Sequence, residues 1–294
     1  MPPKLNQGTV IRMEIIRKID VLQKFLNSIR NDGESIGLVP TMGALHQGHF
    51  ELINYSKKET DLTVCSIYIN PVQFNDKKDF VRYPRDEEKD ISLLENLGCD
   101  VVFIPDDEQM FRGKRLINLD FGSLSNHLEG EFRPGHFNGV ALVVSKLFNI
   151  VKPEVAFFGQ KDLQQYSIIK QMIEEFCFNI ELKMIPTVRE ENGLALSSRN
   201  KLFTNEQRKE ASKLYQALKK VEDVLQTNNS VLEIKKVVEK FLSSSNLRLE
   251  YFEIVNLENF QPVETIEKNN KYGACIAGYL DNIRLIDNII INTQ

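Results

Sequence analysis

Strand-like apolar runs alternate with helical patterns through the first two-thirds of the chain, and no other feature limits the fold as strongly. We predict strands at residues 36–39, 64–69, 101–104, 155–158 and 180–185. Helical periodicity lies between them at residues 19–29, 86–97, 138–151 and 162–176. Strands that alternate with helices form a parallel sheet with helices on both faces, and ligands bind beyond the carboxyl ends of the strands. An α/β fold with a Rossmann-like parallel sheet is therefore expected for the N-terminal part.

The pattern changes after Pro186. Thr204 and Gln207 belong to a capping-box pattern that opens a long helix reaching Leu225. A second helix is predicted at residues 231–242, followed by strands at 251–255, 274–279 and 283–291. We therefore expect a Rossmann-like domain at residues 1–187 and a smaller α+β C-terminal domain at residues 188–294. A single continuous domain is the alternative.

Composition excludes several function classes. The chain has 294 residues and a net charge of −4, so bulk binding of nucleic acid is not expected. No apolar run reaches the roughly 20 residues of a membrane-spanning helix. Residues 1–12 are polar and lack the apolar centre of a secretory signal, and we predict that they form an unstructured extension. The four cysteines lie far apart in the sequence, which is typical of reduced thiols in a cytoplasmic protein.

Residues 36–55 form the first candidate binding site. Pro40 is predicted to end the strand, residues 41–44 to form a small-residue turn, and a helix to begin near His49. A glycine-bearing turn between a strand and a helix presents backbone N–H groups and a positive dipole to a phosphate. His46 and His49 supply two further hydrogen-bond donors for a phosphoryl group. A zinc site and a structural helix cap are the alternatives, although no third zinc ligand has a plausible spacing.

Four further polar clusters follow along the chain. They are Asn70 with Gln73; Arg133 with His136; Gly159, Lys161, Asp162 and Gln165; and Ser197, Ser198 and Arg199. Neutral amides bind polar substrates without neutralising them, and arginine and lysine bind phosphate or carboxylate. A carboxylate such as that of Asp162 caps a helix or contacts a metal ion. Residues 75–85 are polar and loop-like, and we predict that they act as a lid.

With these clusters in this order, the chain resembles the pantothenate synthetase (pantoate–β-alanine ligase) family of the nucleotidylyltransferase superfamily. The resemblance runs from Met13 to the C-terminus. It rests on Pro40-Thr41-Met42-Gly43-Ala44-Leu45-His46-x-Gly48-His49, Asn70-Pro71-x-Gln73-Phe74, Arg133-Pro134-Gly135-His136-Phe137, Gly159-x-Lys161-Asp162-x-Gln164-Gln165 and Ser197-Ser198-Arg199-Asn200. The chain departs from the family in residues 1–12, which precede the usual start, and in Gln160, which stands where Glu is common.

The resemblance implies a ligase of pantothenate biosynthesis that forms an amide bond at the expense of ATP. The carboxylate of pantoate attacks the α-phosphorus of ATP, which gives pantoyl adenylate and pyrophosphate. The amine of β-alanine then displaces AMP and forms pantothenate. Mg²⁺ is the implied cofactor and arrives with ATP rather than in a permanent protein site, with Asp162 as the candidate protein ligand.

The resemblance also implies roles for individual residues. Catalytic roles fall on His46, His49, Lys161 and Arg199, with His49 as the proton donor and the division of labour between the two histidines left open. ATP binding falls on Met42, Gly43, Ala44, Leu45, His46, Gln47, Gly48, His49, Gly159, Gln160, Lys161, Asp162, Val188, Leu196, Ser197, Ser198 and Arg199. Binding of pantoate and β-alanine falls on Gln73, Gln165 and Asn70. The role of Arg133 and His136 is left open.

The resemblance further implies a cytoplasmic homodimer that pairs through its N-terminal domain, with the C-terminal domain as a lid. Neither nucleic acid nor a membrane is an expected partner. Three alternatives stay open at this point: another nucleotidyltransferase with the same His-x-x-His turn, an aminoacyl-tRNA synthetase, and a non-catalytic nucleotide-binding regulator.

Overall fold

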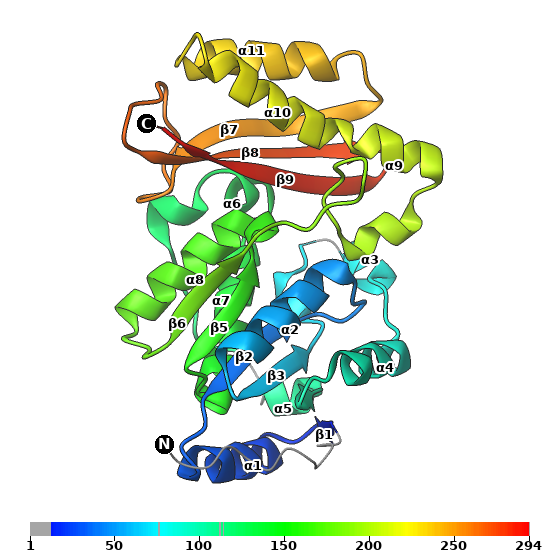
Figure 1. Cartoon of the computed structure of the whole chain (residues 1–294), viewed down its shortest axis with the longest axis vertical. Helices are drawn as coiled ribbons and strands as arrows, with labels where there is room; N and C mark the ends of the chain where they lie inside the picture. Colours follow the sequence, from blue (N-terminus) through cyan, green and yellow to red (C-terminus); the bar gives the residue numbers. More distant parts are fainter. Residues whose placement is uncertain (1–12, 76, 112, 114, 294) are drawn as a thin grey trace.

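The computed structural model describes residues 13–293 except residues 76, 112 and 114 (Figure 1). The predicted extension at residues 1–12 lies outside the described residues.

A six-stranded parallel sheet forms the lower part of the molecule in Figure 1. Its strands are β1 (Glu14–Ile16), β2 (Ile36–Thr41), β3 (Leu62–Ile67), β4 (Val101–Phe103), β5 (Val155–Gly159) and β6 (Glu181–Ile185). They lie in the order β1-β4-β3-β2-β5-β6, and every neighbouring pair is parallel. The predicted α/β class is confirmed. Strand β1 was not among the predicted strands; it has three residues and buries only the last.

Helices cover both faces of this sheet, since side chains alternate across each strand. On one face, Leu38 of β2 packs into a core with α1 (Ile19–Asn31), α7 (His136–Val151) and α8 (Leu163–Glu175). On the other, Val39 packs with α2 (Gln47–Glu59) and α4 (Glu87–Leu97). Shorter helices occupy the connections. They are α3 (Lys77–Arg82), α5 (Asp107–Met110) and α6 (Glu129–Phe132), with 3₁₀ turns η1 (Pro71–Gln73), η2 (Gly122–Ser125), η3 (Gln160–Asp162) and η4 (Ser198–Leu202).

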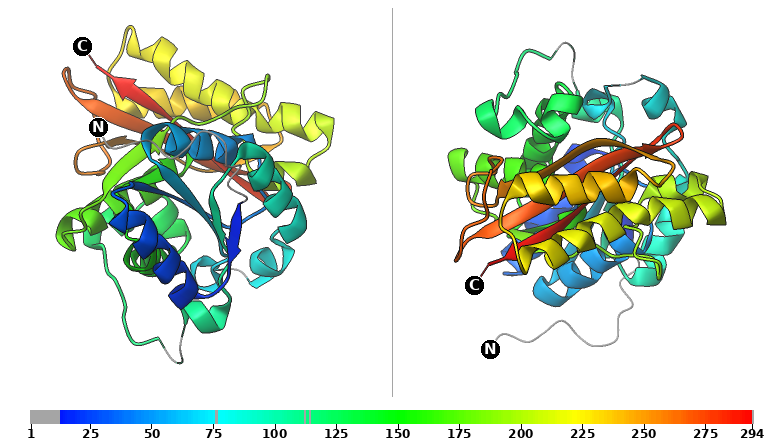
Figure 2. Two further views of the ribbon diagram at one scale, coloured as in Figure 1. Left: turned by 60° about the horizontal axis from the view of Figure 1, so that its bottom comes forward. Right: turned by 90° about the horizontal axis from the view of Figure 1, so that it is seen from above.

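An antiparallel sheet of three strands follows, with a core of its own. Its strands are β7 (Leu247–Asn256), β8 (Lys271–Leu280) and β9 (Ile283–Asn292), and its helices are α9 (Asn205–Ala211), α10 (Lys213–Leu225) and α11 (Val231–Leu242). Figure 2 shows α10 and α11 lying side by side across the strands, and Figure 1 shows the parallel-sheet unit beyond the other face. The predicted smaller α+β part is confirmed, whereas the boundary at residues 187 and 188 stays a prediction.

Two predicted element ends are wrong. Pro40 does not end β2, because the strand continues through Thr41 in register with β3. Its pairing with β5 involves only Gly37 and Leu38, so a residue without an N–H group is tolerated beyond them. The long helix predicted after Thr204 breaks at Ser212, whose hydroxyl donates to the carbonyl of Lys209 at 2.8 Å, a local bond that competes with the helix.

Within the described part of the chain, no helix combines the length and the apolar character that crossing a membrane requires.

Candidate active site

The candidate site lies at the carboxyl ends of β2 and β5, where the chain reverses the direction in which it adds strands. β3 and β4 extend the sheet to one side of β2, whereas β5 and β6 extend it to the other. Crevices at such switch points bind ligands in open α/β sheets. A cavity of about 230 Å³ opens there.

All five sequence clusters meet in this cavity. Of the predicted site residues, it is lined by Met42, His46, Gly48, His49, Asn70, Gln73, Arg133, His136, Gly159, Lys161, Asp162, Gln165, Val188, Leu196, Ser197, Ser198 and Arg199. Gly43, Ala44, Leu45, Gln47 and Gln160 are not among the residues that line it, although all five lie within two positions of one that does.

The two histidines form the start of helix α2. His46 is its N-cap residue, and its Nδ1 accepts a hydrogen bond from the N–H of Gly48 at 3.1 Å. His49 Nδ1 accepts from the N–H of His46 at 3.3 Å, and the two ring centroids lie 4.1 Å apart. Because each Nδ1 accepts, each neutral ring carries its proton on Nε2. The structural cap that the sequence left as an alternative is therefore present, and both rings keep an Nε2–H donor.

Both rings are held neutral. Burial, the other imidazole and Lys161 lower the pKa of His46 to about 2. Burial also lowers the pKa of His49 to about 4, although Asp162 opposes the shift. Two neutral imidazoles can approach each other without repulsion, and each presents a hydrogen bond rather than a full charge to a ligand.

The turn before α2 does not offer the backbone cradle that the sequence suggested. The N–H groups of Ala44 and Leu45 donate to the carboxylate of Asp90 on α4 at 2.7 and 2.8 Å. The N–H of Gly43 donates to the hydroxyl of Thr41 at 3.2 Å. These donors are committed inside the protein in this structure, and ATP binding by this part of the turn stays a prediction. Of residues 42–49, those that line the cavity are Met42, His46, Gly48 and His49.

Asp90 is a residue that sequence reasoning missed. It is 2% exposed, and burial raises the pKa of its carboxyl group against the hydrogen bonds that it accepts. Ala44, which it holds, has a left-handed backbone with φ of +52°. No sequence signal points to Asp90, because it lies among three other acidic residues at the start of α4, Asp86, Glu87 and Glu88.

Asn70 and Gln73 lie at the end of β3, and their roles differ. Both amide hydrogens of Asn70 are committed, one to Gln73 Oε1 at 3.0 Å and one to the carbonyl of Gly139 at 2.9 Å. Its oxygen accepts from the N–H of Val72. The bond from Asn70 fixes Gln73 with its Nε2 group on the other side, where it contacts Met42 Sδ at 2.9 Å. Gln73 therefore offers donors to the cavity, whereas Asn70 orients Gln73.

The η3 turn after β5 brings Lys161 and Asp162 into the cavity. Lys161 Nζ lies 3.7 Å from Asp162 Oδ1. Strand β9 supports this turn, because Asn288 Nδ2 donates to the carbonyls of Gln160 and Lys161 at 3.0 and 2.9 Å. Asn288 Oδ1 in turn accepts from Gln160 Nε2 at 3.2 Å. Asn288 was also missed, since 127 residues separate it from Lys161.

The segment at residues 197–199 closes the cavity from the side of the second sheet. Ser198 is buried, and its hydroxyl donates to the carbonyl of Ala44 at 3.1 Å. Arg199 pairs with Asp79 of α3 at 2.8 Å. The region predicted as a lid thus contains a short helix that contacts a cation of the site. Closure over a ligand stays a prediction.

A second, larger cleft of about 650 Å³ adjoins the cavity. Arg133, Lys161 and Arg199 line both the cavity and the cleft, whereas Arg248 and Arg284 line only the cleft. Such a cluster of cations favours anionic ligands. Among the residues that the structure describes, no three His, Cys, Asp or Glu side chains gather as metal ligands do.

One family model and several curated proteins match nearly the whole chain. The model of the pantoate–β-alanine ligase family matches residues 14–290. The pantothenate synthetase of Thermosipho africanus is 44% identical over 280 residues, which cover 95% of this chain and all of that protein. A similar match, 43% identical over 282 residues, is the pantothenate synthetase of Christiangramia forsetii, with 95% of this chain and all of that protein covered.

Solved structures agree with these matches. The pantothenate synthetase of Thermus thermophilus superposes with a TM-score of 0.87 at 38% identity, covering 94% of this chain and 99% of that one. The pantoate–β-alanine ligase of Francisella tularensis, crystallised with a β,γ-ATP compound and β-alanine, has a TM-score of 0.76 at 33% identity, with 95% and 97% covered.

Proposed function

The chain belongs to the pantoate–β-alanine ligase family, and from this membership we propose which of its residues carry each step. The family reaction is the ATP-dependent condensation of pantoate with β-alanine to pantothenate. It passes through pantoyl adenylate and releases pyrophosphate and AMP.

One observation carries the assignment of residues. The amides of Gln73 and Gln165, the imidazoles of His46 and His49, and the cation of Lys161 line a single cavity. Amide donors suit the hydroxyl and carboxylate oxygens of pantoate, and imidazoles with a cation suit the α-phosphate of ATP. This arrangement supports a binding mode in which the attacking carboxylate of pantoate lies next to the α-phosphorus of ATP.

In the first half-reaction, a pantoate carboxylate oxygen forms a bond to the α-phosphorus, and the bond from that phosphorus to the bridging oxygen of pyrophosphate breaks. The protein contributes mainly position and charge stabilisation. We assign the Nε2–H groups of His46 and His49 to the oxygens of the α-phosphate. Their lowered pKa values keep them neutral, so His49 acts as a hydrogen-bond donor to the α-phosphate. The proton-donor role that the resemblance implies requires that His49 first take up a proton.

In the second half-reaction, the amine nitrogen of β-alanine attacks the carbonyl carbon of pantoyl adenylate. The bond from that carbon to the phosphate oxygen breaks, AMP leaves with the electron pair, and the nitrogen loses a proton. We assign the adjoining cleft as the route for β-alanine, because Arg133, Lys161 and Arg199 line it and attract its carboxylate.

We assign the rest of the cavity to ATP. Val188 and Leu196 give an apolar wall for the adenosine moiety, and Lys161, Ser197 and Arg199 suit its phosphates. The hydroxyl of Ser198 donates to the carbonyl of Ala44. The predicted role of Ser198 in ATP binding therefore requires that this hydrogen bond break, or that the backbone of Ser198 bind ATP instead. The oxygens of Asp162 fit Mg²⁺, which prefers oxygen ligands, and Mg²⁺ bound with ATP would neutralise phosphate charge.

We also propose the coarser properties that the family implies. These are the domain boundary at residues 187 and 188, a C-terminal domain that acts as a lid, a homodimer, and a cytoplasmic location. The two exposed apolar side chains of Leu116 and Ile117 on the N-terminal part are available to such a dimer contact. Sedimentation of the purified protein tests the dimer directly.

The assay that tests the proposed function separates the half-reactions. ATP and pantoate without β-alanine should give pyrophosphate and enzyme-bound adenylate, and later addition of β-alanine should release AMP. Pyrophosphate that does not depend on pantoate would refute the assignment. His49→Ala should fold normally and lose about 10²–10³-fold in the rate of adenylation, the value expected for one transition-state donor. His127→Ala is the matched control, because His127 lies outside the cavity.

A further inference from the structure

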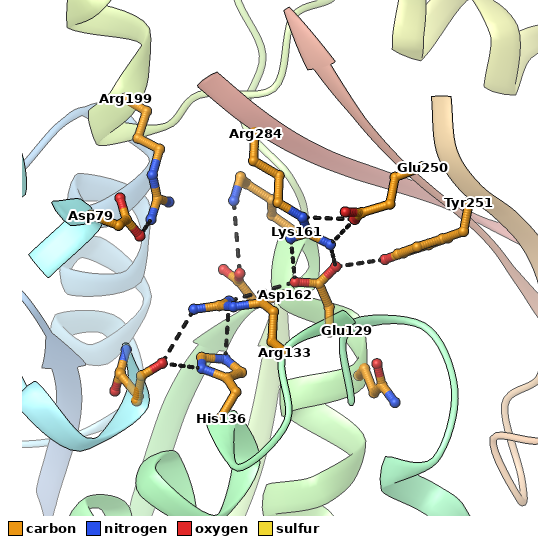
Figure 3. A network of polar contacts seen from close by, with 12 residues as sticks. Asp79, Glu129, Arg133, His136, Lys161, Asp162, Arg199, Glu250, Tyr251 and Arg284 are labelled. Atoms are coloured by element: carbon orange, nitrogen blue, oxygen red, sulfur yellow. Dashed lines mark hydrogen bonds and ion pairs between the residues drawn. The ribbon is translucent and has the colours of Figure 1, made fainter. Parts of the chain in front are cut away.

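We propose that Glu129, Arg133 and His136 form a positioning relay that holds Gln73 in the pantoate site and ties it to strand β9 (Figure 3). The proposal rests on the proposed function, because it takes Gln73 as a pantoate-binding residue. The resemblance places Arg133 and His136 in a family motif and leaves their roles open.

The relay begins at the backbone of Gln73. His136 Nδ1 lies 2.8 Å from the carbonyl oxygen of Gln73. A carbonyl oxygen only accepts hydrogen bonds, so Nδ1 carries the proton. Nε2 of the same ring is then an acceptor, and Arg133 Nη1 donates to it at 3.2 Å. His136 is thus held in the tautomer opposite to that of His46 and His49, which donate into the cavity.

Arg133 continues the relay and contacts the same carbonyl. Its Nη2 group donates to the oxygen of Gln73 at 3.4 Å, and its Nη1 group lies 3.5 Å from Glu129 Oε2. The carbonyl oxygen of Gln73 therefore accepts two hydrogen bonds, one from Arg133 just before α7 and one from His136 at the start of α7. Burial and, second to it, the positive charge of Arg133 lower the pKa of His136 to about 3. The ring therefore stays neutral, with Nε2 unprotonated.

Glu129 connects the relay to the second sheet. Arg284 of β9 binds it with two hydrogen bonds of 2.7 and 2.6 Å, and the hydroxyl of Tyr251 donates to it at 2.8 Å. Arg284 also donates to Glu250 at 2.8 and 2.6 Å. Figure 3 shows these side chains in one continuous network that runs from β7 and β9 down to His136.

The geometry assigns this network to positioning rather than to stability alone. Gln73 lies in a 3₁₀ turn of three residues, which supports its own backbone weakly. The turn is pressed against Gly139 of α7, where an added Cβ would lie 2.8 Å from the N–H nitrogen of Gln73. With the backbone fixed by His136 and the side chain oriented by Asn70, the Nε2 donors of Gln73 have one direction. Buried ion pairs such as that of Glu129 with Arg284 contribute little net stability. We therefore infer that this network serves to fix a geometry.

A pair of substitutions at His136 tests the proposal. His136→Leu removes the donor to Gln73, whereas His136→Asn keeps a donor at the position of Nδ1. We expect His136→Leu to raise KM for pantoate about tenfold or more, with KM for ATP changed less than about twofold. His136→Asn should recover most of the affinity for pantoate. His127→Leu is the matched control, because His127 also bonds a backbone carbonyl, that of Phe260 at 2.6 Å, away from the cavity.

The outcomes separate this proposal from the proposed function. Gln73→Leu should raise KM for pantoate, and if it does not, the assigned role of Gln73 fails. If Gln73→Leu raises it but folded His136→Leu does not, the relay is refuted. Equal losses in His136→Leu and His136→Asn would also refute it. Should His136→Leu not fold, Glu129→Gln decides: a selective rise in KM for pantoate supports the relay, and an unchanged value overturns it.

Discussion

Replacing Asp90 with asparagine tests whether a buried carboxylate outside the lining of the cavity sets the position of the two histidines proposed to be catalytic. Asp90 accepts hydrogen bonds from the backbone of Ala44 and Leu45 at 2.7 and 2.8 Å. The amide of asparagine keeps one acceptor and turns a donor toward the other N–H group. One charge-assisted bond of about 1.5–3 kcal/mol is lost, and the other weakens by roughly half.

The opposing contribution comes from burial. Burial raises the pKa of Asp90, so its charge is already costly and removing it returns part of the loss. We therefore expect Asp90→Asn to lower the free energy of unfolding by about 2 kcal/mol. The left-handed backbone of Ala44, which costs about 1–3 kcal/mol, would relax and displace His46. A displacement of about 1 Å costs on the order of 10²-fold in rate, so adenylation should slow at least tenfold.

Urea denaturation measures the first quantity, and single-turnover release of pyrophosphate measures the second. Asp86→Asn is the matched control on the same helix, because Asp86 only caps α4 through the N–H of Lys89. That variant should lose at most about 1 kcal/mol and keep its rate of adenylation. A stable, folded Asp90→Asn protein with the normal rate would show that the turn does not depend on Asp90.

Three further predictions follow from the site. The folded-state pKa values of His46, His49 and His136 are lowered from 6.5 to about 2, 4 and 3, so the unfolded chain takes up protons first as the pH falls. Urea denaturation should show a loss of stability below pH 6.5, by up to about 1.4 kcal/mol per pH unit for each histidine, and His136→Asn should remove one proton from that slope. Gly139→Ala places a Cβ 2.8 Å from the backbone of Val72 and Gln73. The substitution should lower the free energy of unfolding by about 1–3 kcal/mol and raise KM for pantoate. Unchanged pantoate kinetics would contradict the close packing. Chelation of Mg²⁺ should stop adenylation but leave the melting temperature without ATP unchanged, since the described residues hold no ligand cluster of their own; a lower melting temperature would reveal a resident metal site.

The sequence predicts the frame of the site because the relevant signals are local. Apolar runs locate the strands, and polar clusters directly after them fall at one edge of a parallel sheet. His46, Gln73 and Lys161 were therefore expected together, and the cavity contains all three. Residue type and position within the fold were sufficient for this part.

The partners of each polar group could not be predicted in the same way. Asn70 was expected to bind a ligand, but both of its amide hydrogens are used by Gln73 and Gly139. The N–H groups of the turn at residues 43–45 were expected to face a phosphate, but Asp90 takes two of them. Apart from the bond between Asn70 and Gln73, these pairings join residues that are 45 or more positions apart, and no periodic pattern encodes them.

The position of Arg284 has a consequence for the order of events during protein synthesis. Glu129 is enclosed by the fold, yet the guanidinium that neutralises it follows 155 residues later. Asn288, which holds the turn of Lys161, also belongs to β9. A nascent chain that has completed the parallel sheet still lacks both contacts, and the carboxylate of Glu129 then has Arg133, 3.5 Å away, in place of the bidentate bond from Arg284. The candidate site is therefore assembled in full only after β9 has been synthesised and has paired with β8.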